Sequence, residues 1–169
     1  EGITALARHA QEFDGVVPNS FRVPSDAIKA SEASLPDELR AAITESIARV
    51  QKVSHATLPR AVSLEVSVGG AVETRFVPVD SVGLYVPGGK AVYPSSTVMN
   101  VVPAQAAGVP RIAVASPAQK DNDGLPSNVV LATCALLGVD EVYSIGGASA
   151  IAAMAFGVPE IGMEPVRMV

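Results

Sequence analysis

Charge and cysteine are both scarce in this sequence of 169 residues. Charged residues make up 17% of it, the net charge is -5, and the twelve basic residues are spread along the chain instead of forming a patch. A nucleic acid or an anionic membrane is therefore not an expected partner, and a small molecule is the better candidate. The single cysteine, Cys134, cannot form an internal disulfide. Its apolar neighbours predict a buried thiol in a reducing compartment such as the cytoplasm.

Long apolar runs and histidines are also missing. No stretch approaches the roughly 20 apolar residues of a membrane helix, so no membrane span is expected. The dinucleotide fingerprint G-x-G-x-x-G and the P-loop pattern G-x-x-x-x-G-K-[ST] do not occur. The two histidines, His9 and His55, lie on predicted helices and cannot be combined with Cys134 into a zinc site or an acid–base pair. We expect both to be surface or helix-end residues.

The first half of the sequence predicts helices followed by a hairpin. Apolar residues recur at helical spacing over 3–13 and stop at a glycine. A longer helix is predicted over about 36–55, with Pro36 in its first turn. Two alternating runs, AVSLEVSV and AVETRFVPV, flank Gly69-Gly70. This pattern predicts a β-hairpin with the two glycines in its turn.

From Val82 onward, strand-like runs alternate with helix-like runs. The expected strands are VGLYV, RIAVAS and DEVYSI, and the expected helices are SSTVMNVVPAQAAG, with a bend at Pro103, SNVVLATCALLG and ASAIAAMAFG. The alternation predicts an α/β fold with a Rossmann-like parallel sheet and helices on both of its faces. We place a boundary near Ser81. It separates an N-terminal α+β segment, 1–81, from a Rossmann-like α/β domain, 82–169.

Two glycine-rich turns follow predicted strands, where ligands of parallel sheets gather. In YVPGGKAVYPSS, Pro87 stiffens the exit from the strand, and Gly88 and Gly89 allow a close approach to the backbone. In SIGGASA, Gly146 and Gly147 aim backbone N–H groups and a helix N-terminus at the space above the sheet. Both turns suit a phosphate or a carboxylate, and both also suit a purely structural junction.

The combination of these segments is more specific than each alone. The run VGLYVPGGKAVYPSSTVMNVVPAQAAGV, followed by GVDEVYSIGGASAIAAMAFG, strongly resembles the histidinol dehydrogenase family. The similarity extends to EFDGV and to RFVPVDSVGLYVPGG, and it is closest between Phe76 and Gly157. The resemblance implies an NAD-dependent oxidoreductase of histidine biosynthesis that converts L-histidinol through histidinal to L-histidine, with two NAD+ per turnover. It also implies a zinc ion that holds the substrate and a homodimer whose active sites draw on both subunits.

The resemblance further implies a cofactor groove. Tyr85 corresponds to the tyrosine that lies against NAD in the family, and a core ring with a satisfied hydroxyl is the structural alternative. Ser149 stands where the family's GGAQAIA turn has a glutamine, so this contact could become water-mediated or be lost. Phe13 corresponds to a residue that faces the cofactor, with core packing as its alternative. The full set of implied cofactor residues is Tyr85, Pro87, Gly88, Gly89, Gly146, Gly147, Ser149 and Phe13.

The residues that carry out the reaction in the family have no counterpart in this chain. The catalytic glutamate–histidine pair, the zinc ligands and the GPGN loop correspond to sequence beyond Val169, so no catalytic residue and no metal ligand is expected within 1–169. The chain opens on Glu1 and closes on PVRMV, which predicts a strand cut off before its loop. We therefore expect part of a longer protein, inactive and prone to associate by itself.

Two alternative functions remain open from the sequence. The first is a homologue that oxidises another alcohol, and Ser149 in place of the glutamine is its support. The second is a non-catalytic α/β module that binds an anion or a nucleotide at its glycine turns.

Overall fold

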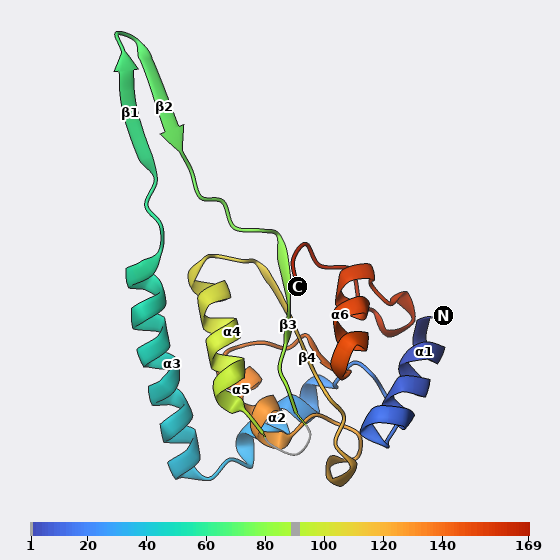
Figure 1. Cartoon of the computed structure of the whole chain (residues 1–169). Helices are drawn as coiled ribbons and strands as arrows, with labels where there is room; N and C mark the ends of the chain where they lie inside the picture. The colour runs from blue at the N-terminus through green and yellow to red at the C-terminus, as the bar shows by residue number, and fades with distance from the viewer. Residues whose placement is uncertain (1, 89–91) are drawn as a thin grey trace.

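The computed structural model, which describes residues 2–88 and 92–169, has a three-stranded parallel sheet at its centre (Figure 1). The strands are β3 (Ser81–Tyr85), β4 (Arg111–Ser116) and β5 (Val142–Ser144), in the spatial order β3-β4-β5. In this register Tyr85 lies opposite Ala115, and Ser116 lies opposite Ser144. The predicted α/β fold with a parallel sheet is confirmed, and each of the three predicted strands is present.

Helices cover both faces of the sheet, because successive strand residues point to opposite sides and are apolar on both. One cluster joins Val114 and Val142 of the strands to α2 (Ser25–Ala33), α3 (Asp37–Thr57), α4 (Pro94–Ala106) and α5 (Asn128–Leu136). The other cluster joins Ala115 and Tyr143 to α1 (Gly2–His9) and α6 (Gly147–Phe156). We call these the α4-side cluster and the α6-side cluster.

The N-terminal helices follow the sequence prediction with two differences. Helix α1 continues into the π-helical turn η1 (Ala10–Asp14) and ends at Gly15, whose φ is +69°. Helix α3 begins one residue after Pro36, so the proline precedes the first turn instead of lying in it. Helix α2 was not predicted. Its buried face includes Ser31, whose hydroxyl donates to the Ala27 carbonyl. This polar residue interrupts the regular spacing of apolar residues from which a helix is predicted.

The predicted hairpin is confirmed, and it projects away from the body of the molecule (Figure 1). It consists of β1 (Val62–Ser67) and β2 (Gly70–Thr74). Because Ser67 pairs with Gly70, the turn is Val68-Gly69, and the predicted Gly69-Gly70 turn is wrong by one residue. Gly69 alone takes up the positive φ, +74°, that the turn requires.

Both edges of the central sheet are covered by extended segments. At β5, the Ser144 N–H donates to the Phe21 carbonyl at 2.8 Å. At β3, the Gly83 N–H donates to the Met168 carbonyl at 2.8 Å. The predicted strand in PVRMV is therefore only one bridge, between Val82 and Met168, and not a continuous strand.

Segments on either side of Ser81 pack against each other. Helix α2 contacts α5, α3 contacts α4, and all four contribute to the α4-side cluster. The division into 1–81 and 82–169 stays a prediction. Helix α4 runs through Pro103, where the predicted bend also stays a prediction. Within residues 2–88 and 92–169, no helix has the length and apolarity needed to cross a membrane.

Candidate functional site

The turns that leave the three parallel strands meet around Pro117, directly after β4. A Cβ atom added to Gly88 would lie 3.1 Å from Cδ of Pro117. A Cβ atom added to Gly146 would lie 3.2 Å from Cβ of the same proline. The two glycine turns that the sequence singled out are therefore both in contact with one residue at the carboxyl edge of the sheet. Gly89 lies outside the described residues.

Tyr85 links the end of β3 to the start of α6. Its hydroxyl oxygen accepts a hydrogen bond from the Gly147 N–H at 3.1 Å. This N–H belongs to the first residue of the helix, where backbone donors have no partner within the helix. The ring is half-buried and packs against the α6-side cluster. The geometry agrees with the structural alternative for Tyr85, and its contact with a cofactor stays a prediction.

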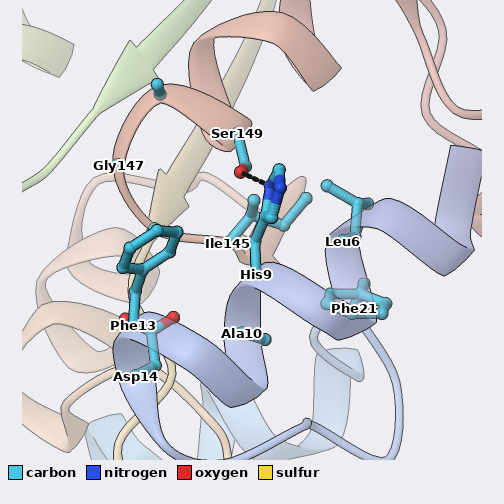
Figure 2. Close-up of a pocket in the computed structure, with 11 residues that line it drawn as sticks. Leu6, His9, Ala10, Phe13, Asp14, Phe21, Ile145, Gly147 and Ser149 are labelled. Carbon is cyan, nitrogen blue, oxygen red and sulfur yellow. Dashed lines mark hydrogen bonds between the residues drawn. The ribbon is translucent and has the colours of Figure 1, made fainter. Parts of the chain in front are cut away.

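A cavity of about 280 Å³ lies between the N-terminal helix and the turn from β5 to α6 (Figure 2). Its volume is close to the lower end of the roughly 300–1,000 Å³ typical of small-molecule pockets. Four predicted cofactor residues line it, namely Phe13, Gly146, Gly147 and Ser149. The remaining lining residues are Leu6, His9, Ala10, Asp14, Phe21, Ile145 and Ala148. Tyr85, Pro87 and Gly88 lie outside this lining.

His9 and Ser149 contact each other across the cavity, as Figure 2 shows. The distance between Nδ1 of His9 and Oγ of Ser149 is 2.7 Å, and both residues are half-buried. His9 is the last residue of α1, as predicted, but it also lines the cavity, which was not predicted. His55 is exposed in the last turn of α3, as predicted. The sequence held a signal for His9, because it precedes Phe13 by four residues and so shares its helix face.

Phe13 presents its ring at the cavity instead of packing in the core. Its side chain is 74% exposed, so the core-packing alternative is wrong. The ring centroid lies 5.9 Å from that of His9, with the planes tilted by 57°. An exposed aromatic face beside a polar pair can stack against a planar ligand group.

Asp14 places a carboxylate directly against the turn after β5. A Cβ atom added to Gly146 would lie 3.1 Å from each of its carboxylate oxygens, so a side chain at that position would push the carboxylate away by a few tenths of an ångström. Burial raises the pKa of the Asp14 carboxyl above its usual value. No described residue forms a hydrogen bond or an ion pair with this carboxylate. Asp14 was not among the site residues predicted from the sequence.

These contacts change what the Gly146-Gly147 turn can bind. The Gly147 N–H, which was expected to face an anion, already donates to Tyr85. An anion beside Gly146 would also meet the Asp14 carboxylate. The cavity therefore suits a neutral group with hydrogen-bond donors better than the phosphate or carboxylate that the sequence suggested.

The described residues contain neither a set of metal ligands nor a reactive thiol. Within it, no group of three or more His, Cys, Asp and Glu side chains could hold a metal ion, so a zinc site does not fit these residues. Cys134 is fully buried, as predicted, and burial raises the pKa of its thiol to about 12. A thiol in this state is not a nucleophile at neutral pH.

Known proteins match the chain along its whole length. A sequence model of the family described as histidinol dehydrogenase matches residues 1–169. A histidinol dehydrogenase of Thermobifida fusca is 54% identical over 168 residues, and one of Corynebacterium efficiens is 50% identical over 168 residues. Each alignment covers 99% of this chain, but only 38% and 37% of the respective relative. The chain thus spans somewhat more than a third of the length of these relatives.

The fold matches a solved structure to a similar extent. The crystal structure of histidinol dehydrogenase from Elizabethkingia anophelis superposes with a TM-score of 0.88 at 31% sequence identity. The superposition covers 96% of this chain and 37% of that one.

Proposed function

Since the chain belongs to the histidinol dehydrogenase family, we propose that it contributes to the NAD-dependent, four-electron oxidation of L-histidinol through histidinal to L-histidine. The observation that carries the proposal is the match over all of residues 1–169, with relatives of that name at 50% and 54% identity. The clustering of Phe13, Gly146, Gly147 and Ser149 around one cavity supports a cofactor-binding role for this part of the protein.

The described residues would hold part of the cofactor and leave the proton transfers to other groups. NAD+ supplies the hydride acceptor when it is bound, two molecules serve each substrate, and water supplies the second oxygen of the product. Phe13 offers an aromatic face, the Tyr85 hydroxyl fixes the first turn of α6, and His9 orients the hydroxyl of Ser149. We assign the general base and the zinc ligands to regions of the relatives that this chain does not cover.

The proposal includes a homodimer in the cytoplasm. The exposed apolar side chains of the hairpin support association, because a two-stranded ribbon is only marginally stable without further packing. The reduced, buried Cys134 is consistent with a reducing compartment.

The test uses the product of the intact gene that encodes this chain. We expect L-histidinol, NAD+ and zinc to yield two NADH for each L-histidine, measured by absorbance and by chromatography of the amino acid. A chelator provides the control. NADH formed from another alcohol but not from L-histidinol would favour the homologue with a different substrate. Nucleotide binding without oxidation of any alcohol would favour the non-catalytic module.

A further inference from the structure

The Asp14 carboxylate is the only charged side chain among the described residues that line the cavity. No lysine or arginine is found among these lining residues of the described ranges, and the neighbouring basic group, the His9 imidazole, is engaged at Nδ1 by Ser149. Lys120 packs against Gly15, the next residue along the chain, but it forms no ion pair with Asp14. The carboxylate is thus half-buried, and no residue in the described part of the chain donates a hydrogen bond to it.

An ionised carboxylate accepts hydrogen bonds and cannot donate them. Leaving it without donors costs free energy, so a ligand that brings hydroxyl groups gains from the contact. Two adjacent hydroxyls match the two oxygens of one carboxylate, and in dinucleotide-binding folds an acidic side chain at the carboxyl edge of the sheet receives the hydroxyls of a ribose. Here Asp14 reaches that edge from the N-terminal helix, against Gly146.

The rest of the cavity fits the base that a ribose carries. The Phe13 ring, on the residue before Asp14, is 74% exposed and offers a face for stacking. No set of metal ligands accompanies it among the described residues. A stacking face beside a carboxylate that accepts hydrogen bonds matches a purine base and its ribose, which together make up the adenosine half of a dinucleotide.

We propose that Asp14 is a specificity-determining residue that accepts hydrogen bonds from the ribose hydroxyls of the adenosine half of NAD. The inference rests on the proposed function. It adds a residue that contacts the cofactor and a preference for NAD+ over NADP+. A 2′-phosphate on this ribose would remove one donor and place two negative charges beside Asp14, and the described lining residues include no lysine or arginine to offset them. The site therefore binds NAD+ and rejects NADP+.

The experiment measures binding, not turnover, by calorimetric titration of the intact gene product. The ligands are NAD+, NADP+, adenosine and 2′-deoxyadenosine. We expect the parent protein to bind NAD+ more tightly than NADP+, and adenosine more tightly than its deoxy analogue. In Asp14→Asn, the affinity for NAD+ and for adenosine falls by about 10-fold or more, as expected for a hydrogen bond to a charged group, and both preferences shrink.

Two further variants test whether the loss of affinity in Asp14→Asn comes from the lost contact and not from the change of charge or from unfolding. Glu12→Gln makes the same charge change in the same turn, on an exposed residue outside the cavity, and leaves all four affinities unchanged. Gly146→Ala keeps the Asp14 charge but brings a methyl group to 3.1 Å from both oxygens, and it weakens NAD+ and adenosine alike. Thermal melting of each variant confirms that it is folded.

The outcomes distinguish this inference from the proposed function. Undiminished affinity of Asp14→Asn for NAD+ and adenosine would overturn the inference alone, as would a parent protein that binds adenosine and 2′-deoxyadenosine equally. An Asp14→Asn variant that loses affinity for L-histidinol but not for adenosine would also overturn it, because the carboxylate would then serve an ammonium group. A parent protein that binds no NAD+ would overturn the proposed function together with the inference.

Discussion

The hydroxyl of Tyr85 accepts the backbone N–H of Gly147 at 3.1 Å, across 62 positions of the sequence. Tyr85 ends β3, Gly147 begins α6, and β4 lies between their two strands in the sheet. The bond therefore ties an outer strand to the helix that carries Ser149. The wall of the cavity is set by a residue that does not itself line it.

Tyr85→Phe removes this acceptor and leaves the ring in place. We expect the free energy of unfolding to fall by about 1 kcal/mol, because the Gly147 N–H loses its partner. Urea denaturation measures the change. Tyr93→Phe is the control, since Tyr93 is 48% exposed and its hydroxyl has no partner among the described residues. Equal stability of the two variants would show that the Tyr85 hydroxyl contributes nothing to the fold.

Glu141 should make stability depend on pH. Burial by itself raises the pKa of its carboxyl, but hydrogen bonds from Arg111, at 2.8 and 3.0 Å, and from Tyr143, at 3.0 Å, outweigh burial and lower the pKa below the usual 4.5. A lowered pKa in the folded state stabilises the protein above about pH 4.5, and this contribution is lost as the pH falls through the folded-state pKa.

Glu141→Gln tests this dependence by urea unfolding at a series of pH values. The variant is less stable than the parent protein at neutral pH, and the difference narrows on acidification. Glu45→Gln is the matched control, because Glu45 pairs with Arg49 on the exposed surface of α3, where such a pair is worth little. A constant difference between Glu141→Gln and the parent at all pH values would contradict the prediction.

Asp14→Asn should raise the melting temperature. The pKa of Asp14 is higher in the folded state than its usual 3.8, because burial disfavours the charged form. The ionised carboxylate therefore costs stability at neutral pH, and asparagine removes that cost. Solvent screening keeps the gain small, about 1 °C, and it disappears in acid. A lower melting temperature at pH 7 would indicate that Asp14 has a structural partner.

Cys134 should resist thiol reagents in the native protein. Its side chain is fully buried in the α4-side cluster, and its pKa is raised to about 12, so almost no thiolate is available. We expect no colour with Ellman's reagent under native conditions and one thiol per chain in guanidinium chloride. Rapid labelling without denaturant would show that the helix pair α4 and α5 opens readily.

The hairpin should promote association without supporting the fold of the body. Val62, Leu64 and Val72 are 57–61% exposed, and Leu64 pairs directly with Val72 on one face. Replacing all three by threonine keeps β propensity and removes most of the apolar face, of which Val66 remains. We expect light scattering to show weaker self-association and thermal melting to show no change. A large loss of thermal stability would mean that the hairpin packs on the body.

Apart from α2, the order of the helices and strands was predictable from the sequence because it depends on local periodicity. The strand runs around Val82 and Val142 and the glycines that follow the helices carry this information in short windows. The hairpin turn was misplaced by one residue, since either glycine of Gly69-Gly70 satisfies the turn chemistry and only the register chooses between them.

Some site residues could be predicted from the sequence, whereas others depend on contacts that form only in the folded chain. The glycine turns after the strands were predictable, because β–α junctions at the carboxyl edge are a property of the fold class. His9 and Asp14 were not, because their roles depend on Ser149 and Gly146, more than 130 positions away, which only the folded chain brings near. The spacing of four residues places His9 on the helix face of Phe13, but it does not show that this face meets Ser149.

The bond between His9 and Ser149 spans 140 positions, and this has a consequence for how the chain matures during synthesis. At a translation rate of about 5–20 residues per second, His9 waits roughly 7–28 s before Ser149 is even polymerised. During that interval the apolar residues Leu6 of α1 and Ala10 of η1 have no partner from α6. Helix α1 therefore stays accessible to chaperones and proteases until α6 has been synthesised and can pack against it.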